Sequence, residues 1–399
     1  MGEYERYRRA LAGRRLPCAF VDLDRFDANA ASLVRRAGGV PIRVVSKSLR
    51  CPALLRRALE HPGFAGIMAY SPAEAAWLHT EGFDDILVAY PSVERHDLVA
   101  VARRIIDHGA RIRLVVDDPV QVLVLSQVAQ QTRHDLPTVF ELVIDIDMSL
   151  ILPGLHIGVQ RSPLRNLEGI LALAALIGDT HGVELVGLMG YEAQVAGLAD
   201  DLPGQRARNL ALRVMSQGSR GLLHERRAAA VAALRAEGFE LELVNGGGTG
   251  SLEHSRQDRC LTELAAGSGL LAPTSFDHYR DFGHHPALGF ALPVVRRPDT
   301  GVFTCAGGGY VASGPVGADR LPQPWLPAGA RLSPHEGAGE VQTPVCFDHP
   351  PALEIGDPIM FRPTKSGELC EHFAALLLLH DGSVIDEAPT YRGLGQCWQ

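Results

Sequence analysis

Short runs of β-forming residues alternate with helical segments in this 399-residue chain, from about residue 17 to residue 285. The helical segments, such as Arg206–Glu237, are rich in Ala, Leu and Arg. Eight strands with helices between them predict an α/β fold, a (β/α)8 barrel of the TIM type, although the order alone also allows an open doubly wound sheet. The expected strands are Cys18–Val21, Ile42–Val45, Gly66–Ala69, Asp85–Ala89, Arg113–Val116, Glu141–Ile146, Leu185–Gly190 and Glu240–Val244.

The composition and periodicity of the sequence change after His285. Gly and Pro become frequent, helical periodicity is scarce, and strand-like runs stand between turns. We therefore expect two domains, a barrel over residues 1–285 and a separate β domain over residues 286–399. The strand-like runs of the second domain include Gly289–Val295, Gly301–Cys305 and Phe373–Leu379.

Composition limits the kinds of partner and compartment. Hydrophobic residues make up 46% of the chain, and the net charge of -8 without a basic run argues against a nucleic-acid partner. No apolar stretch is long enough to span a membrane, and the N-terminus lacks the apolar core of a signal peptide. The seven cysteines form no CxxC pair. These features predict a reduced, cytoplasmic enzyme with no membrane partner, rather than a disulfide scaffold.

Lys47 ends the strand-like run that begins at Ile42, between Ser46 and Ser48. An amine held at the end of a buried strand loses hydration and becomes a better nucleophile, as a Schiff-base lysine must. The alternative is a solvated lysine at a strand end.

A glycine-rich turn, Asn245–Ser251, follows the last expected strand and contains four glycines, a threonine and a serine. Glycines let backbone N–H groups approach an anion closely, and hydroxyl groups add donors. The turn lacks the third glycine of a dinucleotide fingerprint and the lysine of a Walker loop. A second turn of small residues follows at 265–269. Late strand ends of a barrel often build a phosphate site, which would share one mouth with Lys47; a turn without a ligand is the alternative.

The strand-end Lys47, the Gly-Gly-Gly-Thr turn and a β domain after a barrel together resemble the alanine-racemase-type (fold type III) pyridoxal-phosphate enzymes. Within that superfamily the chain resembles the D-threonine aldolase and D-serine dehydratase group. More narrowly, it resembles the actinobacterial proteins described as amino acid deaminase/aldolase. The resemblance covers nearly the whole chain and is carried by residues 145–163, 187–197, 307–315, 336–344 and 362–373.

The resemblance implies that Lys47 forms the Schiff base with pyridoxal phosphate, while the protein orients the cofactor and moves protons. The residues that it implies for the cofactor site are Lys47, Gly247, Gly248, Thr249, Gly267 and Ser268, with Tyr279 as a candidate for the pocket lining.

Three further residues are candidates for the active site. His156 stands where relatives carry an arginine beside the cofactor's phenolic oxygen, and Arg161 follows five residues later; either could donate to that oxygen. Tyr191 ends an expected strand, where barrel side chains meet ligands. A loop histidine and a core tyrosine without catalytic roles are the alternatives for His156 and Tyr191.

Relatives bind manganese or zinc in the segment that corresponds to residues 362–373. By alignment the ligand pair falls on Glu368 and Cys370, with Glu in place of the usual His, and Cys370 with His372 is the other pairing. Residues two apart in a strand point to one face, so either pair could hold one ion. Cys and His favour zinc, and Glu also accepts manganese. A structural segment without a metal is the alternative.

The resemblance implies a homodimeric lyase that acts on D-configured 3-hydroxy amino acids. The preferred reaction is aldol or retro-aldol cleavage, which interconverts the substrate with a small amino acid and an aldehyde. β-Elimination of water to an oxo acid and ammonia, as in a dehydratase, is the second candidate. A non-catalytic pyridoxal-phosphate-binding protein ranks third, because such proteins lack the long C-terminal β domain.

Overall fold

The computed structural model describes residues 2–132, 138–152 and 154–398. The chain divides into two compact units. The barrel unit comprises residues 33–47, 58–267 and 398–399, and the sheet unit comprises residues 1–32, 48–57 and 268–397.

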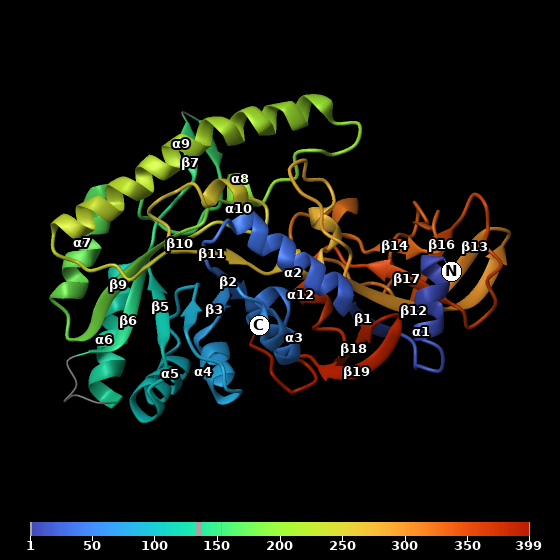
Figure 1. Cartoon of the computed structure of the whole chain (residues 1–399), viewed down its shortest axis with the longest axis horizontal. Coiled ribbons are helices and arrows are strands. Elements are labelled where there is room, and N and C mark those ends of the chain that lie inside the picture. The colour runs from blue at the N-terminus through green and yellow to red at the C-terminus, as the bar shows by residue number, and fades with distance from the viewer. Residues whose placement is uncertain (1, 133–137, 153, 399) are drawn as a thin grey trace. The chain divides into compact units, whose positions relative to one another are not determined.

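The barrel unit is built on eight parallel strands that close on themselves (Figure 1). This closure confirms the predicted (β/α)8 barrel and excludes the open sheet. Around the barrel the strands are β10 (Leu243–Gly246), β11 (Glu263–Ala266), β2 (Ile42–Val45), β3 (Phe64–Ala69), β4 (Ile86–Val88), β5 (Ile112–Val116), β6 (Thr138–Asp145) and β9 (Gly182–Gly190).

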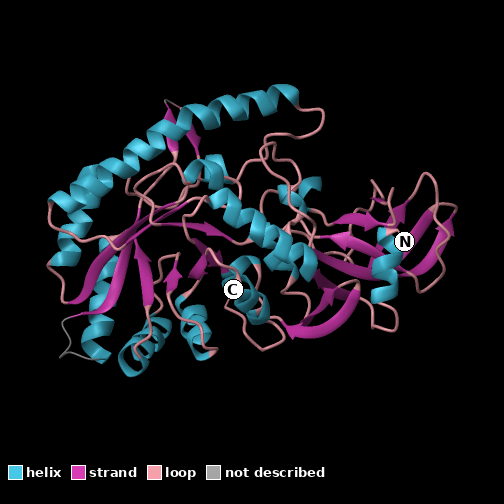
Figure 2. Ribbon diagram, viewed as in Figure 1, coloured by secondary structure: helices cyan, strands magenta, loops and turns pink. Residues whose placement is uncertain are grey.

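Helices lie along the outside of these strands (Figure 2). The helices within the barrel unit are α4 (Pro72–Thr80), α5 (Arg95–His108), α6 (Pro119–Thr132), α7 (Leu167–Gly178), α8 (Ala193–Ala196), α9 (Arg206–Ala236) and α10 (Leu252–Ser255), and a hairpin is formed by β7 (Leu150–Leu152) and β8 (Leu155–Ile157). Two helices, α2 (Leu23–Ala37) and α3 (Pro52–Glu60), run from one unit into the other. The buried apolar cluster of the barrel consists of Leu87, Ala89, Val115, Val143, Val186, Met189 and Leu243.

The strand predicted at Cys18–Val21 exists but is not a barrel strand. It is β1 (Cys18–Asp22), which pairs antiparallel with β12 (Leu288–Asp299) and parallel with β18 (Ala375–His380). The eighth barrel strand is instead β11, four residues that end in the second small-residue turn. A buried apolar run suits a central strand of either sheet, so its composition could not decide between them.

The sheet unit holds nine strands, of which β12 pairs with β1, β13 and β17. The other strands of this sheet are β13 (Val302–Ala306), β14 (Gln323–Leu326), β15 (Arg331–Leu332), β16 (Gln342–Cys346), β17 (Pro358–Arg362) and β19 (Ser383–Pro389). Its helices are α1 (Glu3–Ala10), α11 (Ser268–Leu271) and α12 (Ser366–Leu369).

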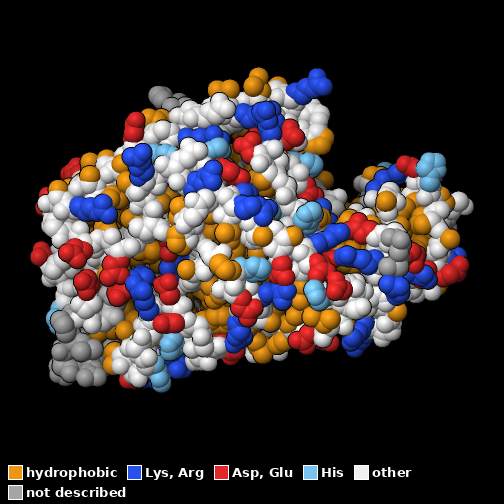
Figure 3. All heavy atoms as spheres, viewed as in Figure 1, with side chains coloured by type: hydrophobic (Ala, Val, Ile, Leu, Met, Phe, Trp, Pro, Cys, Tyr) orange, Lys and Arg blue, Asp and Glu red, His pale blue; other side chains and the backbone are white. Residues whose placement is uncertain are grey.

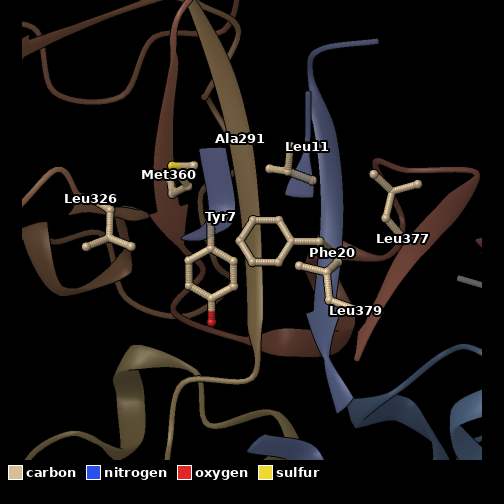
Figure 4. Packing of buried hydrophobic residues seen from close by; sticks show 8 residues of the cluster. All are labelled: Tyr7, Leu11, Phe20, Ala291, Leu326, Met360, Leu377 and Leu379. Carbon is tan, nitrogen blue, oxygen red and sulfur yellow. The ribbon is translucent and has the colours of Figure 1, made fainter. Parts of the chain in front are cut away.

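The N-terminal helix takes part in the core of this unit. Tyr7 of α1 and the following Leu11 pack with Phe20 of β1 and Ala291 of β12 (Figure 4). Tyr7 and Phe20 are fully buried, with ring centres 5.1 Å apart. The N-terminal helix thus belongs to the sheet unit rather than to the barrel unit.

Charged side chains of both signs are interspersed on the face of the molecule that Figure 3 shows. No helix among the described residues combines the length and the apolar character needed to cross a membrane.

A buried ion cluster lies near the amino ends of β2, β4 and β11. Arg43, which is 2% exposed, donates to the two carboxylate oxygens of Glu263 at 2.6 and 2.8 Å. The same guanidinium donates to the Asp85 carbonyl at 2.6 Å and to the Asp85 carboxylate at 3.1 Å. Asn245 adds a hydrogen bond to Glu263 at 2.7 Å. The buried charges are therefore paired, as burial requires.

Replacing Arg43 with Met should lower the free energy of unfolding by about 3–5 kcal/mol, because Glu263 would keep a buried charge without its partner. Urea unfolding followed by circular dichroism measures the loss. The matched control is Arg331→Met, which breaks a pair with Asp348 in which both side chains are more than half exposed. This control should change stability far less. An equal loss in both variants would contradict the structural role of the cluster.

Candidate active site

Lys47 lies in a short 3-10 turn, Ser46–Ser48, that directly follows β2. Its amine donates a hydrogen bond to the hydroxyl of Tyr90 and lies 5.0 Å from the centre of the Tyr90 ring. The Ser46 hydroxyl donates to the Met68 carbonyl at 3.0 Å, which ties the turn to β3. Tyr90 follows β4. Because parallel strands present their carboxyl ends at one mouth, Lys47 and Tyr90 share the end of the barrel where active sites lie.

Lysine is rare in this chain: of 38 lysine and arginine residues, only Lys47 and Lys365 are lysines. Arginine keeps its proton in proteins, whereas a lysine amine can lose its proton and attack a carbonyl carbon. A position that needs a nucleophilic amine therefore cannot accept arginine. This scarcity singles out Lys47 independently of the strand motif.

Arg161 joins two tyrosines at the same mouth. Its guanidinium carbon lies 5.6 Å from the ring centre of Tyr90 and 5.6 Å from that of Tyr191, which follows β9. The structure thus links Lys47, Tyr90, Arg161 and Tyr191 in one cluster. The sequence reasoning missed Tyr90, although its place just after a strand was a usable signal.

Among the described residues, no hydrogen bond or ring contact joins His156 to this cluster. His156 sits in β8, opposite Ile151 of β7, and its Nε2 atom is buried with no hydrogen-bond partner among the residues that the structure describes. Of the two residues expected near the cofactor's phenolic oxygen, the structure therefore places Arg161 with the tyrosines. A catalytic role for His156 stays a prediction.

Tyr191 is held in its protonated form. Burial raises the pKa of its phenol to about 12; the Arg161 cation opposes this rise, while Tyr90 and Glu192 add to it. At neutral pH Tyr191 can therefore donate a proton but cannot act as a base.

Two carboxyl groups end neighbouring strands at the mouth. Asp117 directly follows β5 and Asp145 is the last residue of β6, in a register that pairs Val116 with Ile144. Both side chains are buried. Burial raises the pKa of Asp145 to about 8, Asp117 adds to the rise, and Arg161 opposes it. Asp145 is therefore a second proton donor at neutral pH, which the sequence reasoning did not identify.

The glycine-rich turn lies directly after β10. Gly247 adopts a φ of +76°, and its N–H donates to the Glu192 carboxylate at 2.8 Å. The Gly248 N–H donates to the Ser251 hydroxyl at 3.1 Å. A Cβ atom on Gly248 would lie 3.3 Å from a ring carbon of Tyr191, so the turn runs close to the tyrosine cluster. Both N–H groups have partners within the chain, and phosphate binding by this turn stays a prediction.

The other residues predicted for the phosphate divide between the units. Thr249 is buried in the barrel unit, where its carbonyl accepts from Arg36 at 2.7 Å, and Gly267 directly follows β11. Ser268 begins α11 of the sheet unit, where its hydroxyl lies 2.9 Å from that of Ser48.

Tyr279, the candidate for the pocket lining, belongs to an aromatic group of the sheet unit. Its ring is stacked on Phe276 with centres 5.5 Å apart, and it lies 4.9 Å from the ring of Phe282.

A buried arginine of α9 connects the loops at the mouth. Arg227 is fully buried and forms ion pairs with Glu192 and Asp258, which are buried as well. It also donates to the Gly190 carbonyl at 3.1 Å. Glu192 thereby joins the Arg227 cation to the backbone of Gly247.

The segment expected to be a metal-binding strand is not a strand. Residues Ser366–Leu369 form the single helical turn α12, and β18 begins only at Ala375. The Glu368 carboxylate accepts from the Ser313 N–H at 2.7 Å, from its hydroxyl at 2.6 Å and from Lys365 at 3.2 Å. Burial alone would raise the pKa of Glu368, but these bonds hold it below its usual value. The alternation argument for a shared face therefore fails here.

Cys370 and His372 also have other partners. The Cys370 thiol is 1% exposed and contacts the Leu49 carbonyl at 3.3 Å, and burial, with Cys51 nearby, raises its pKa. Metal binding needs the thiolate, which this environment disfavours. The His372 ring lies 4.8 Å from the Tyr310 ring. Among the described residues, the group of three that brings ligand atoms within 4.8 Å of one another is instead Asp24, His380 and Asp381.

Comparison with known proteins supplies the family. The sequence model of the alanine racemase N-terminal domain matches residues 21–271. D-threonine aldolase from Arthrobacter sp is 26% identical over 254 residues, 63% of this chain and 60% of that relative. The chain thus spans less than two thirds of the curated relative that it matches.

Solved structures resemble the chain over nearly its whole length. D-threonine aldolase from Filomicrobium marinum has a TM-score of 0.80 at 22% identity, over 95% of each chain. D-threo-3-hydroxyaspartate dehydratase from Delftia sp. HT23 has a TM-score of 0.76 at 21% identity, over 98% of this chain and 100% of that one. At these identities the likeness shows the fold.

The raised pKa of Asp145 predicts a pH dependence of stability. An unfolded aspartate titrates near pH 4, so the stability that the buried neutral form contributes is complete below about pH 4 and is lost as the pH rises to about 8. In Asp145→Asn this loss, about 1.4 kcal/mol per pH unit in that window, should be absent.

Urea unfolding of both proteins between about pH 5 and about pH 8 measures the difference. The matched control is Asp348→Asn, because Arg331 holds the pKa of exposed Asp348 below its usual value and outside this window. If wild type and Asp145→Asn lost stability in parallel over the window, Asp145 would be charged in the folded protein.

Proposed function

This chain belongs to the alanine racemase N-terminal domain family, and from that premise we propose that it is a pyridoxal-phosphate-dependent lyase of D-configured 3-hydroxy amino acids. The observation that carries the proposal is the amine of Lys47, held against the Tyr90 hydroxyl at the mouth of the barrel. The similar proteins named above act, by their names, on D-threonine and D-threo-3-hydroxyaspartate, which are substrates of this class.

The residues of the mouth suit this cofactor. Lys47 supplies an amine that would hold it covalently, and Arg161, which lies over two tyrosine rings, supplies a cation for a phenolate or a carboxylate. The turn at Gly247 and Gly248 presents backbone without side chains. When bound, pyridoxal phosphate withdraws electrons from the Cα atom of an amino acid.

Retro-aldol cleavage is the reaction that we prefer. It breaks the Cα–Cβ bond of the substrate and yields a small amino acid and an aldehyde. The β-hydroxyl must lose its proton to a base, for which His156 is the candidate.

β-Elimination of water is the second candidate, and one observation favours it. A leaving hydroxyl needs a proton donor. Tyr191 and Asp145 are both donors at neutral pH, because burial raises their pKa values to about 12 and about 8.

The proposal includes a second subunit but no obligatory metal ion. An ion on Glu368 and Cys370 would require these side chains to give up the hydrogen bonds that they make to Ser313, Lys365 and Leu49. We therefore propose a reaction without an obligatory metal. The homodimer is proposed from the family resemblance.

Borohydride reduction of the protein incubated with pyridoxal phosphate should fix the cofactor on Lys47. Because the chain has only two lysines, mass spectrometry of the digest assigns the modified peptide directly. Lys47→Ala should lose the fixed cofactor and the visible absorbance, because no amine would stand at the mouth. Lys365→Ala, the matched control, should keep both. Cofactor fixed on Lys365 of the wild-type protein in preference to Lys47 would overturn the proposal.

A panel of D- and L-3-hydroxy amino acids should yield products from the D isomers. Aldehyde identifies retro-aldol cleavage, and ammonia with an oxo acid identifies elimination; each assay is run with and without a chelator. If elimination is found, Tyr191→Phe should slow it by on the order of 10²-fold, because a proton donor is removed. A protein that carries the cofactor on Lys47 but converts no substrate would be a non-catalytic carrier. Complete loss of activity with the chelator would contradict the metal-free reaction.

A further inference from the structure

Tyr90 holds a position that the proposed function does not yet use. Its hydroxyl is the hydrogen-bond partner of the Lys47 amine. Its ring and that of Tyr191 each lie 5.6 Å from the Arg161 guanidinium carbon. A cation over an aromatic face is attracted to the ring, so the Arg161 guanidinium favours this placement of both rings. The Tyr90 hydroxyl is therefore held beside the Nζ atom of Lys47.

We propose that Tyr90 is a catalytic residue that carries protons for Lys47 when the amine joins or leaves an aldehyde carbon. The inference rests on the proposed function, in which Lys47 is the reacting amine.

The step balances without another reactant. Joining an amine to an aldehyde forms a C=N bond and releases one water, so two hydrogens must pass from nitrogen to the carbonyl oxygen. For the first, the Tyr90 oxygen accepts a hydrogen from Nζ as the N–C bond forms, and its own hydrogen passes to the carbonyl oxygen. The same exchange moves the second hydrogen from Nζ to the former carbonyl oxygen, which then leaves as water. Tyr90 ends with its hydroxyl intact, and the reverse sequence frees the amine.

The neighbouring acids fit this role less well. The ring of Tyr191 contacts Arg161. The hydrogen bond described for Lys47 goes to Tyr90 and not to Tyr191. Burial raises the pKa of Asp145; its neighbour Asp117 adds electrostatically to that rise, and Arg161 lowers the pKa. A hydroxyl that both accepts and donates can pass a proton without changing its own charge, and the Tyr90 hydroxyl is the one described beside Nζ of Lys47.

Tyr90→Phe tests the inference, because it keeps the ring under Arg161 and removes the hydroxyl alone. The cofactor-free full chain is mixed with pyridoxal phosphate, samples are reduced with borohydride at intervals, and the modified peptides are quantified. The rate at Lys47 should fall by on the order of 10²-fold, while the final extent of labelling is unchanged. The rate at Lys365, whose amine contacts the Ser313 hydroxyl, should not change, so it serves as an internal control. Added imidazole, a mobile proton carrier, should restore much of the rate at Lys47.

Tyr4→Phe is the matched control, since its hydroxyl donates to the Pro358 carbonyl in the sheet unit; it should label like wild type. An unchanged Lys47 rate in Tyr90→Phe would overturn this inference and leave the proposed function intact. A slow variant that imidazole does not restore would make Tyr90 a positioning residue and overturn proton transfer. A wild-type protein in which Lys47 reacts no faster than Lys365 would overturn the proposed function and this inference with it.

Discussion

One buried cation on α9 fixes the mouth of the barrel on which the candidate site depends. A charge withdrawn from water persists in a folded protein only where partners compensate it closely. Arg227 meets this requirement with two buried carboxylates, Glu192 and Asp258, and with the Gly190 carbonyl. These partners follow β9 and α10, and Glu192 extends the network to the N–H of Gly247 after β10. Two consecutive strand ends are thus tied to one helix by one guanidinium.

This network also fixes the position of Tyr191. This residue lies between Gly190 and Glu192, both of which Arg227 binds. Its ring is then bounded by the turn at Gly248, where a Cβ atom would lie 3.3 Å away, and by the Arg161 guanidinium at 5.6 Å. Tyr90 is restrained through the same Arg161, and its hydroxyl meets Lys47. The position of the Lys47 amine therefore depends on packing and charge that extend to a helix on the outside of the barrel.

Local patterns in the sequence were sufficient for the barrel and for the place of Lys47 at a strand end, and insufficient where a long-range choice decided the outcome. Alternating strands and helices predicted the closed sheet, but β1 pairs with β18, some 350 residues further along the chain. No local signal specifies such a partner. The short β11, which begins with buried Glu263, is a strand because Arg43 on the neighbouring strand β2 compensates that charge. A four-residue strand with an acidic first residue carries no clear periodic pattern.

The candidate site shows the same limit. Lys47 and Tyr191 were predictable because each ends a strand, and Tyr90 carried the same signal. The segment around Glu368 was mispredicted as a strand because alternation was assumed where Glu368 accepts three hydrogen bonds and the chain turns into α12. A side chain's hydrogen-bond partners come from distant segments, and spacing alone does not reveal them. Proton affinity follows the same rule: the raised pKa of Asp145 depends on burial and on Asp117, which lies on another strand.

The arginines and the lysine of the barrel unit differ in the tasks to which their charges are suited. Arg43 at the amino end of the barrel and Arg227 at its carboxyl end are permanent charges paired with carboxylates, for which the planar guanidinium with five donors is well suited. Arg161 supplies a third charge, with its guanidinium carbon 5.6 Å from the centres of two tyrosine rings. None of these tasks needs a cation that can lose its proton, and each is performed by arginine. Lys47 stands among them as the one amine of the barrel unit, beside a hydroxyl that can take a proton from it. In a chain that otherwise prefers arginine, that exception is best explained by a step in which the nitrogen must become neutral and form a bond.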